Sequence, residues 1–597
     1  MEVCVSVHSE VLRALQNVTW KKSGLCGFLV GYGDAQDRKV VAFTLRSEID
    51  CKRVVPDAIE VERLLPGGLS VCGIIVHNVH PTDTTEVAIP NELVEHLDLS
   101  PLVVCHIKTE GKVTSDNFYL MLFDNTPVKK TVKTTNTNLL AEYQFFQIKA
   151  NIPITVAVEA DCKDWSNSIE TEVDQLCKRV SDGCCMYAIS DSAVMFGQGQ
   201  VKGVQDNALC DNLYEYMQAG DGFLTRSKQK DLKKQSCMQV EIFFLASGEA
   251  AFINIPTCAP VIQRKMGTYK CVKINLPLNV ISLIKSGTKV NNLQKIFDQA
   301  VLSQLQAMKQ CILKFSQGDR FHTPEVFHIQ PEDLPFIVSV IFPKGVSEQD
   351  LESSRRHLHD LFGVVADWPV FKRANVFLLP GDRMLNGYLI NPHIGLPPSG
   401  IKDGKPCIVH GKYTYHHYMQ DHFDDNKWGC AYRSLQTLVS WFHLQGYTDR
   451  PVPSHKEIQQ ALVAVGDKDA SFVGSKKWIG SLEVSYCLEQ LIQVTSKIIS
   501  VSSGSELSSK GRELCNHFTT QGSPIMIGGG VLAHTILGVD FNEVTGDVKF
   551  LILDPHYTGG EDIKVIQDKG WCGWKGPDFW DSNAHYNLCL PQRPTAI

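Results

Sequence analysis

Cys430 stands where a cysteine could act as a nucleophile. It lies in Asp424–Leu435 (DDNKWGCAYRSL), where polar side chains that favour helix starts precede an apolar run with the spacing of one helical face. The pattern predicts a buried helix with Cys430 in its first turn and Gly446 as its stop. Unpaired backbone N–H groups and the helix dipole favour a thiolate at this end of a helix. Cys430 is therefore the candidate nucleophile.

The candidate base lies far downstream, in Phe550–Gly560 (FLILDPHYTGG). Four apolar residues predict a buried strand that ends at Asp554 and His556. The proline between them fixes the turn, and residues two apart on an extended backbone point to the same side. In a Cys–His–Asp arrangement the imidazole takes the thiol proton and the carboxylate orients the imidazolium. We expect His556 and Asp554 to be the partners of Cys430.

His534 is an alternative base. It lies in Gly528–Gly538 (GGGVLAHTILG), also at the start of an apolar strand, and the order Cys430, His534, Asp554 is that of papain-like proteases. We favour His556. Any one of 20 cysteines is most often a small buried hydrophobe, and a single histidine is most often structural. The catalytic interpretation depends on all these segments falling within the length of one domain.

Longer segments carry a family resemblance over roughly residues 390 to 595. They are Asn391–Gly400 (NPHIGLPPSG), Tyr415–Asp421 (YHHYMQD), Trp428–Thr437 (WGCAYRSLQT), Phe472–Ser475 (FVGS), Ile527–Gly538, Leu553–Gly559 and Gly570–Trp580 (GWCGWKGPDFW). These segments resemble the ubiquitin-fold modifier-specific proteases. The first of them, together with the long N-terminal extension, resembles the larger, type 2 form of that family.

The resemblance implies roles for four side chains. Cys430 matches the family's nucleophile, Asp554 and His556 match its Asp-Pro-His pair, and Tyr418 matches the tyrosine of its oxyanion hole. A hydroxyl aimed at the developing oxyanion supplies an electrostatic stabilisation that is usually large in acyl transfer. One departure is Lys427, which stands where the family is expected to carry glycine. A positive φ at this position would strain a lysine.

The implied reaction is thiol-dependent hydrolysis after the C-terminal glycine of a ubiquitin-fold modifier, in a precursor or in an isopeptide to lysine. This chemistry calls for no metal and no other cofactor. We expect Gly529, Gly530, Trp571 and Trp574 to help form a narrow groove for the modifier's tail. Core packing is the alternative role of the tryptophans, and we favour it slightly.

Composition predicts a soluble cytoplasmic protein of several domains. The chain has 597 residues, 43% hydrophobic and 21% charged, and its net charge of −7 gives no general nucleic-acid signature. Twenty cysteines without a Cys-x-x-Cys pair argue against zinc ribbons and disulfide frameworks and fit a reducing compartment. No signal peptide is recognised at the start, and no stretch of 18 apolar residues predicts a transmembrane segment.

The N-terminal part predicts an interaction domain. Gly24–Phe43 reads as two strands, and Leu69–Val76 as another that runs into His77-Asn78-Val79-His80-Pro81. This order weakly resembles the MPN domain. Alignment on His80 places Asn78, Ala88 and Asn91 at the other zinc-ligand positions, where they cannot build a catalytic zinc site. We expect a metal-free domain, with His77 and His80 as a zinc pair the less favoured alternative.

The middle region offers fewer signals. Leu293–Phe315 predicts a long core or interface helix, and Ser347–Asp350 resembles a capping box before a second helix. The lysine-rich Arg226–Lys234 is better explained as a solvated loop than as a nuclear address. Pro392–Gly404, rich in proline and glycine, marks the start of the C-terminal domain.

Together these patterns predict an α+β multidomain protein. An MPN-like α/β domain spans residues 1–150, a mixed middle region 151–390, and a papain-like cysteine protease domain 391–597. The resemblance implies a ubiquitin-fold modifier as substrate and an MPN-like adaptor that recruits the protease to the endoplasmic reticulum, with a nuclear pool as a further possibility. Two rival functions are an autophagin-like protease for another modifier, and a scaffold that binds the modifier without turnover.

Overall fold

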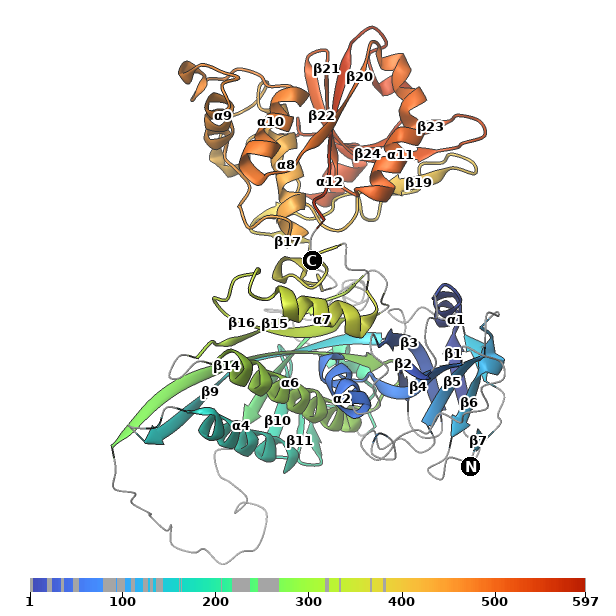
Figure 1. The fold of residues 1–597 in the computed structure, drawn as a ribbon, viewed down its shortest axis with the longest axis vertical. Helices are drawn as coiled ribbons and strands as arrows, with labels where there is room; N and C mark the ends of the chain where they lie inside the picture. Colours follow the sequence, from blue (N-terminus) through green and yellow to red (C-terminus); the bar gives the residue numbers. More distant parts are fainter. Residues whose placement is uncertain are drawn as a thin grey trace, which may run out of the picture. The chain divides into compact units, whose positions relative to one another are not determined.

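The protein is built from two compact units, and the colours of Figure 1 follow the chain from one to the other. Residues 1–366 and 376–381 form unit 1, and residues 367–375 and 382–597 form unit 2. The computed structural model describes residues 4–18, 24–33, 37–46, 53–78, 93, 102–108, 113–121, 127–128, 132–135, 143–159, 162, 164–205, 207–216, 237–244, 268–316, 321–331, 334, 336–364, 368–379 and 383–595. Divisions at residues 150 and 390 remain predictions.

The first sheet of unit 1 has eight strands in the order β7-β6-β5-β4-β2-β3-β1-β8. Helix α1 (Ser9–Gln16) packs on β1 and β3 of this sheet, and helix α2 (Val54–Leu64) packs on β4. The three strands predicted for this part of the chain are confirmed as β2, β3 and β4. The strands are β1 (Cys4–His8), β2 (Gly24–Gly33), β3 (Asp37–Leu45), β4 (Ser70–Asn78), β5 (Leu102–Lys108), β6 (Phe118–Met121), β7 (Pro127–Val128) and β8 (Lys133–Thr135).

The MPN resemblance stays a prediction, because most of its diagnostic positions fall outside the described residues. His77 lies in β4 and is buried. His80, Ala88 and Asn91 lie outside the described residues, as does the lysine-rich stretch 226–234.

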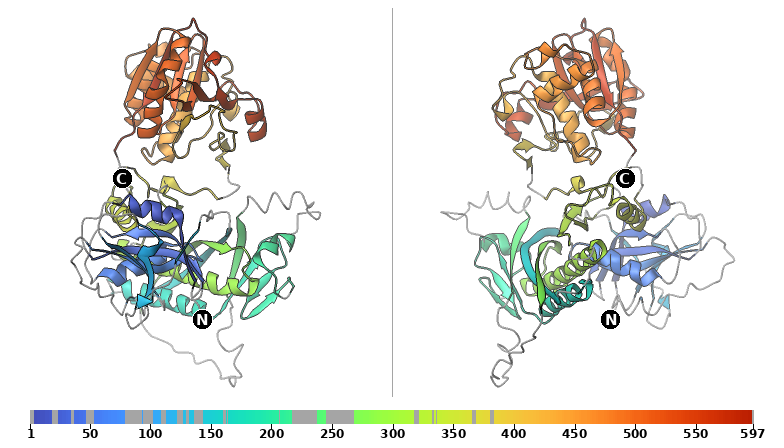
Figure 2. Two further views of the ribbon diagram at one scale, coloured as in Figure 1. Left: turned by 90° about the vertical axis from the view of Figure 1, so that its right-hand side faces the viewer. Right: turned by 60° about the vertical axis from the view of Figure 1, so that its left-hand side comes forward.

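The second sheet of unit 1 has the order β12-β11-β10-β13-β9-β14. Its longest strands, β9 and β14, pair antiparallel over 17 residues each. Helices α4 (Ser166–Ser181) and α6 (Leu293–Phe315) pack against them and against each other, as Figures 1 and 2 show. The strands are β9 (Tyr143–Glu159), β10 (Cys185–Ile189), β11 (Met195–Gly197), β12 (Gln200–Lys202), β13 (Met238–Phe244) and β14 (Tyr269–Lys285).

Both helices predicted for the middle region are confirmed. Helix α6 has the predicted bounds. Helix α7 (Glu352–Phe362) is not capped by the predicted box, because its N-cap is Leu351, which makes no side-chain cap hydrogen bond. The box residues bond each other in the turn before the helix: the backbone N–H of Asp350 donates to Ser347 Oγ at 3.2 Å, and that hydroxyl donates to the Asp350 carboxylate at 2.7 Å. Strands β15 (Pro324–Ile329) and β16 (Val338–Pro343) form a separate antiparallel pair.

Unit 2 has a sheet in the order β20-β25-β21-β22-β23-β24, with β19 paired to β22. Helices α8 and α10 pack on its strands β21, β22 and β25, and Figure 1 shows them to the left of β21 and β22, with α11 to the right of these two strands. The strands are β19 (Lys405–Ile408), β20 (Ser496–Val501), β21 (Ile525–Gly529), β22 (Leu532–Phe541), β23 (Val548–Leu553), β24 (Cys572–Lys575) and β25 (Tyr586–Pro591). The helices are α8 (Cys430–Leu444), α9 (His455–Ala464), α10 (Ser481–Ile492), α11 (Gly511–Thr520) and α12 (Ile563–Asp568). Short strands β17 (Met384–Leu385) and β18 (Tyr388–Leu389) pair just before this sheet.

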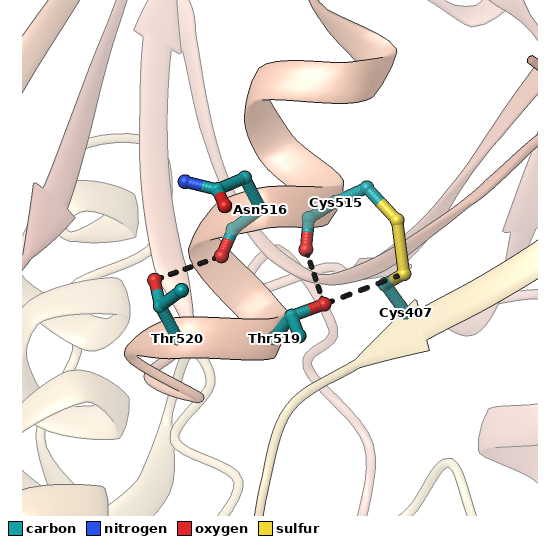
Figure 3. The surroundings of a disulfide bond; sticks show 5 residues. All are labelled: Cys407, Cys515, Asn516, Thr519 and Thr520. Atoms are coloured by element: carbon teal, nitrogen blue, oxygen red, sulfur yellow. Dashed lines mark hydrogen bonds between the residues drawn. A yellow bond between two sulfur atoms is a disulfide. The ribbon is translucent and has the colours of Figure 1, made fainter.

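A disulfide joins Cys407 of β19 to Cys515 of α11 (Figure 3). Thr519 donates to the Cys515 carbonyl at 2.8 Å, and its hydroxyl lies 3.8 Å from the Cys407 sulfur. This bond corrects the expectation that the cysteines remain unpaired. The two cysteines are 108 residues apart in the sequence, so their spacing carried no signal, and they meet because α11 packs against β19.

Among the helices that the structure describes, none combines the length and the apolar character needed to cross a bilayer.

Candidate active site

Cys430 is the first residue of α8, as predicted. Every residue of this helix from Cys430 to Phe442 is buried, and strands β21 and β22 and helix α10 pack against it. The helix start is therefore held by the core of unit 2. The backbone N–H of Ala533, in β22, donates a hydrogen bond to the Cys430 thiol and favours the thiolate. The nucleophile thus lies between the start of a helix and the start of a strand.

Asp554 and His556 follow β23, and their side chains meet as predicted. The His556 ring donates from Nδ1 to Asp554 Oδ1 at 2.6 Å, and the His556 backbone N–H donates to the same oxygen at 2.9 Å. The backbone of Asp554 is fixed on both sides. Its N–H donates to the Trp571 carbonyl at 2.8 Å, and its own carbonyl accepts from the Tyr415 hydroxyl.

The three groups shift each other's pKa values toward a thiolate–imidazolium pair. Burial alone would lower the pKa of His556, but its hydrogen bond to Asp554, its interaction with the Cys430 thiol and the charges of both groups raise it to about 9. Burial likewise opposes ionisation of Cys430 and Asp554. The interaction with His556 and its charge nevertheless lower the pKa of the thiol, and the hydrogen bond from His556 to Asp554 lowers the pKa of the carboxyl. Such mutual shifts are typical of an activated cysteine nucleophile.

The remaining ring nitrogen of His556 faces the thiol without closing a regular hydrogen bond. Nε2 is buried and makes no hydrogen bond of ordinary geometry, while the interaction with Cys430 is strong enough to shift both pKa values. We interpret the ring and the thiol as aligned, with the distance from Nε2 to the Cys430 sulfur shortening when substrate binds, because catalytic hydrogen bonds often shorten only in the substrate complex.

Tyr418 completes the site on the side of the helix start. Its hydroxyl donates to the Cys430 thiol and accepts from the backbone N–H of Cys430, and its ring contacts His556 edge-on at 5.3 Å. Burial, and then the neighbouring thiolate, raise the pKa of this phenol well above its usual range, so it remains a proton donor. The Tyr418 backbone N–H donates to the Pro555 carbonyl at 3.0 Å. The Tyr418 hydroxyl and the backbone N–H of Cys430 therefore lie together beside the thiol.

His534 lies nearby but is not arranged as a base for Cys430. Its Nε2 is 3.9 Å from Asp554 Oδ2, and its ring packs against His556, Phe579 and Trp580. Burial lowers its pKa to about 4, so it is neutral at pH 7. The geometry favours His556 as the base.

The predicted groove residues separate into two kinds. Gly529 ends β21 so close to Tyr586 that an added Cβ would lie 2.1 Å from its ring, and Gly530 turns the chain with φ +58°. Trp571 and Trp574 are partly buried and pack against the hydrophobic core. Core packing, the alternative expected for the tryptophans, is what the structure shows, while their contact with a substrate stays a prediction.

Exposed apolar side chains near Cys430 were missed. Met419, Phe423, Trp478, Val531 and Leu532 are 42–66% exposed. The first two lie in the loop before Cys430, the last two directly precede Ala533, and Trp478 donates to the Lys427 carbonyl at 3.2 Å. Residue type does not distinguish such positions from core positions, so no sequence signal could have found them.

His534, Asp554 and His556 offer ligand atoms within 4.8 Å of one another, a spacing that a metal ion could also use. The short bond between His556 Nδ1 and Asp554 and the pull of His556 on the thiol are, however, the features of a proton-transfer site. We therefore assign no metal to these residues.

Lys427 has φ +71°, so the position does require the left-handed conformation that favours the expected glycine. Lysine occupies it in this chain with its carbonyl bound to the Trp478 indole.

Known protein families match both units of the chain. Residues 404–589 match peptidase family C78, and residues 170–384 match the N-terminal domain family of ubiquitin-fold modifier 1 specific protease 2. The chain is 47% identical over 429 residues to Ufm1-specific protease 2 of Gallus gallus, covering 71% of this chain and 92% of that protein. It is 47% identical over 398 residues to the Homo sapiens protein, covering 66% and 84%.

Two further matches span nearly the whole chain. Probable Ufm1-specific protease 2 of Drosophila melanogaster is 33% identical over 620 residues, with 99% of each chain covered. The crystal structure of UfSP from C. elegans superposes with a TM-score of 0.70 at 25% identity over 100% of both chains. The α+β multidomain fold with a C-terminal papain-like protease domain is thereby confirmed.

Proposed function

The chain belongs to the Ufm1-specific protease 2 family, and we propose that Cys430, His556 and Asp554 carry out its cleavage of Ufm1. The protein is a cysteine peptidase that processes this modifier and removes it from conjugates. The observation that carries the assignment of residues is the chain of contacts from the Asp554 carboxylate through the His556 ring to the Cys430 thiol.

The first half of the reaction forms a thioester. The Cys430 thiolate attacks the carbonyl carbon of the modifier's last glycine, and the C–N bond then breaks as the imidazolium of His556 gives its proton to the leaving amine. In the second half His556 takes a proton from water, which attacks the thioester and releases the modifier with a free carboxylate. Asp554 keeps the ring oriented throughout and stabilises its charged form.

Tyr418 and the backbone N–H of Cys430 stabilise the oxyanion in both halves. The phenol stays protonated because its pKa is raised, and it lies against the same N–H group. Removal of one oxyanion donor typically slows an acyl transfer by about a hundred- to a thousand-fold.

We infer that the body of the modifier rests on the exposed apolar residues beside Cys430. Two of them, Met419 and Phe423, lie in the loop before Cys430, and Trp478 donates to the Lys427 carbonyl of that loop. Val531 and Leu532 directly precede Ala533, whose backbone N–H bonds the Cys430 thiol. Exposed apolar groups of this kind mark protein-binding surfaces. A tail that passes Gly529 and Gly530 would approach the backbone closely, since neither residue has a side chain.

Reaction with Ufm1 that carries a C-terminal electrophile tests these roles. We expect a covalent adduct with this probe and none with the matching ubiquitin or autophagy-modifier probes. The adduct should be lost in Cys430→Ser and His556→Ala and kept in His534→Ala. An adduct with the autophagy-modifier probe instead would favour the autophagin-like rival, and no adduct from folded protein would favour the scaffold.

For the N-terminal part we propose recruitment rather than catalysis. The active-site residues all belong to unit 2, and unit 1 has hydrophobic cores of its own. On this proposal unit 1 binds an MPN-like adaptor that brings a cytoplasmic protease to the endoplasmic reticulum. Removal of residues 1–366 should spare cleavage of a soluble Ufm1 precursor and change localisation. Loss of precursor cleavage in a folded truncation would refute this division.

A further inference from the structure

The loop between Tyr418 and Cys430 has an unusual backbone. Met419, Asp421, His422 and Lys427 all have positive φ, at +66°, +60°, +55° and +71°. Residues other than glycine avoid this region, and several in one short loop persist only where surrounding contacts hold them. This loop links the oxyanion tyrosine to the nucleophile, so whatever holds it also sets their separation.

Asp425 is the centre of those contacts. Its side chain is fully buried and accepts three hydrogen bonds. The backbone N–H of Met419 donates to Oδ1 at 2.9 Å, Arg433 Nε donates to Oδ2 at 2.7 Å, and His455 Nε2 donates to Oδ2 at 3.0 Å. The first of these bonds holds the residue that directly follows Tyr418.

Arg433 reaches the same loop at two more points. It lies one turn after Cys430 in α8 and is itself fully buried. Its Nη1 donates to Asp421 Oδ2 at 3.2 Å and its Nη2 to the Gln420 carbonyl at 3.1 Å, while Nη1 also bonds Gln436. One guanidinium therefore ties the helix that carries the nucleophile to the loop that carries the oxyanion donor.

We propose that Arg433 and Asp425 are positioning residues for catalysis. They hold the loop 419–427 in its strained form, and so place the Tyr418 hydroxyl beside the backbone N–H of Cys430. Neither side chain touches the reacting atoms, so both act through Tyr418. The proposal rests on the oxyanion role of Tyr418 in the proposed function.

The alternative is that the pair only stabilises the fold. A buried ion pair is weak evidence for net stability, because the desolvation of both charges offsets their attraction. The two roles differ in one measurable respect. If the pair acts through Tyr418, its substitution should have little further effect on catalysis once the phenol is removed. If the pair merely stabilises unit 2, its substitution should have the same effect with or without the phenol.

The test is a double-mutant cycle on the full chain, with hydrolysis of a Ufm1 precursor as the assay. Arg433→Lys keeps the charge but loses the planar fork of donors. We expect kcat to fall about 30-fold, with KM changed less than about 3-fold, since displacement of one donor costs at most what its removal costs. In the Tyr418→Phe background the same change should lower kcat by less than about 3-fold.

Asp421→Asn guards against a failure of Arg433→Lys to fold. The Asp421 side chain is 50% exposed, so the substitution weakens one bond to Arg433 without disturbing the buried pair. It should show the same dependence on Tyr418 with a smaller loss, about 3- to 10-fold. Tyr388→Phe is the matched control. The Tyr388 hydroxyl donates to the other oxygen of Asp421 at 2.5 Å, so this substitution leaves the bond between Asp421 and Arg433 in place.

Ser399→Ala is a second control. It removes a buried hydroxyl that donates to Asp540 at 2.5 Å. Asp540 lies in β22, six residues after His534. Its effect should be small and equal in both backgrounds. Losses of kcat that multiply between Arg433→Lys or Asp421→Asn and Tyr418→Phe would refute the positioning role. If Tyr418→Phe alone left kcat unchanged, the oxyanion assignment itself would be wrong.

Discussion

Replacement of His556 and of His534 by glutamine distinguishes the two possible bases of Cys430. The rise of the His556 pKa from 6.5 to about 9 is 2.5 units, which corresponds to about 3 kcal/mol of preference for the imidazolium beside Asp554 and the thiolate. The same coupling lowers the pKa of the thiol below its ordinary value of 9.0. Without the imidazolium, the two largest effects that lower the thiol pKa are absent, so this pKa should rise toward that value.

The magnitude follows from the ionised fraction of the thiol. A thiol of pKa 9.0 is about 1% thiolate at pH 7, so His556→Gln should slow alkylation of Cys430 by iodoacetamide by up to about 100-fold at this pH. His534 is neutral and makes no hydrogen bond to the thiol, so His534→Gln should change the rate less than about 10-fold.

The assay is the rate of Cys430 alkylation from pH 5 to 10, followed by mass spectrometry of the peptide that contains it. In the wild type the rate should reach its plateau below the ordinary thiol pKa. In His556→Gln the midpoint should move upward, toward the ordinary thiol pKa. A His556→Gln protein that is alkylated rapidly at pH 6, together with a slow His534→Gln protein, would overturn the assignment of the base.

Three further predictions concern stability. Lys427→Gly should raise the free energy of unfolding by about 0.5–1 kcal/mol, because glycine adopts φ +71° without strain. Lys456→Gly within α9 is the control and should lower the free energy of unfolding by about 1 kcal/mol. Thermal unfolding measures both variants, and equal shifts would contradict the backbone argument. Gly529→Ala should destabilise by about 1–3 kcal/mol in urea titration, because the new Cβ would lie 2.1 Å from the Tyr586 ring, and a neutral effect would mean that the ring moves freely. His517 has a pKa of about 4 in the folded protein and 6.5 in the unfolded chain, so the unfolded state binds more protons between these values. The free energy of unfolding therefore falls as the pH drops from 6.5 to 4. Urea titrations at each pH should show a smaller fall for His517→Asn, and an unchanged slope would exclude His517 as a source of the pH dependence.

The parts of the site that sequence could predict are those with local signals. Polar residues followed by an apolar run of helical periodicity located Cys430 in the first turn of α8, although Gly429 at the N-cap makes no side-chain cap hydrogen bond. An apolar run before Asp-Pro-His located a strand end that presents Asp554 and His556 together. At the helix start and at the strand end, a few neighbouring residues determine the local conformation. The positive φ of Lys427 was anticipated differently, through the family resemblance, which implies glycine at its position.

The parts that sequence could not predict depend on residues brought together by the fold. The disulfide between Cys407 and Cys515 needs β19 beside α11, which no spacing of cysteines indicates. Asp425 and Arg433 were visible in the motif around Cys430, but their charges suggest a solvated surface until burial is known.

The geometry also explains why core packing in unit 2 should matter to catalysis. The start of α8, the start of β22 and the end of β23 each bring one part of the site, and backbone hydrogen bonds join them: Ala533 to the Cys430 thiol, and Tyr418 to the Pro555 carbonyl. A displacement of any one element therefore separates donor from acceptor at the reacting carbonyl, where misplacement by about 1 Å can cost about a hundred-fold in rate. Substitutions that loosen the buried length of α8 should consequently reduce kcat before they unfold the protein.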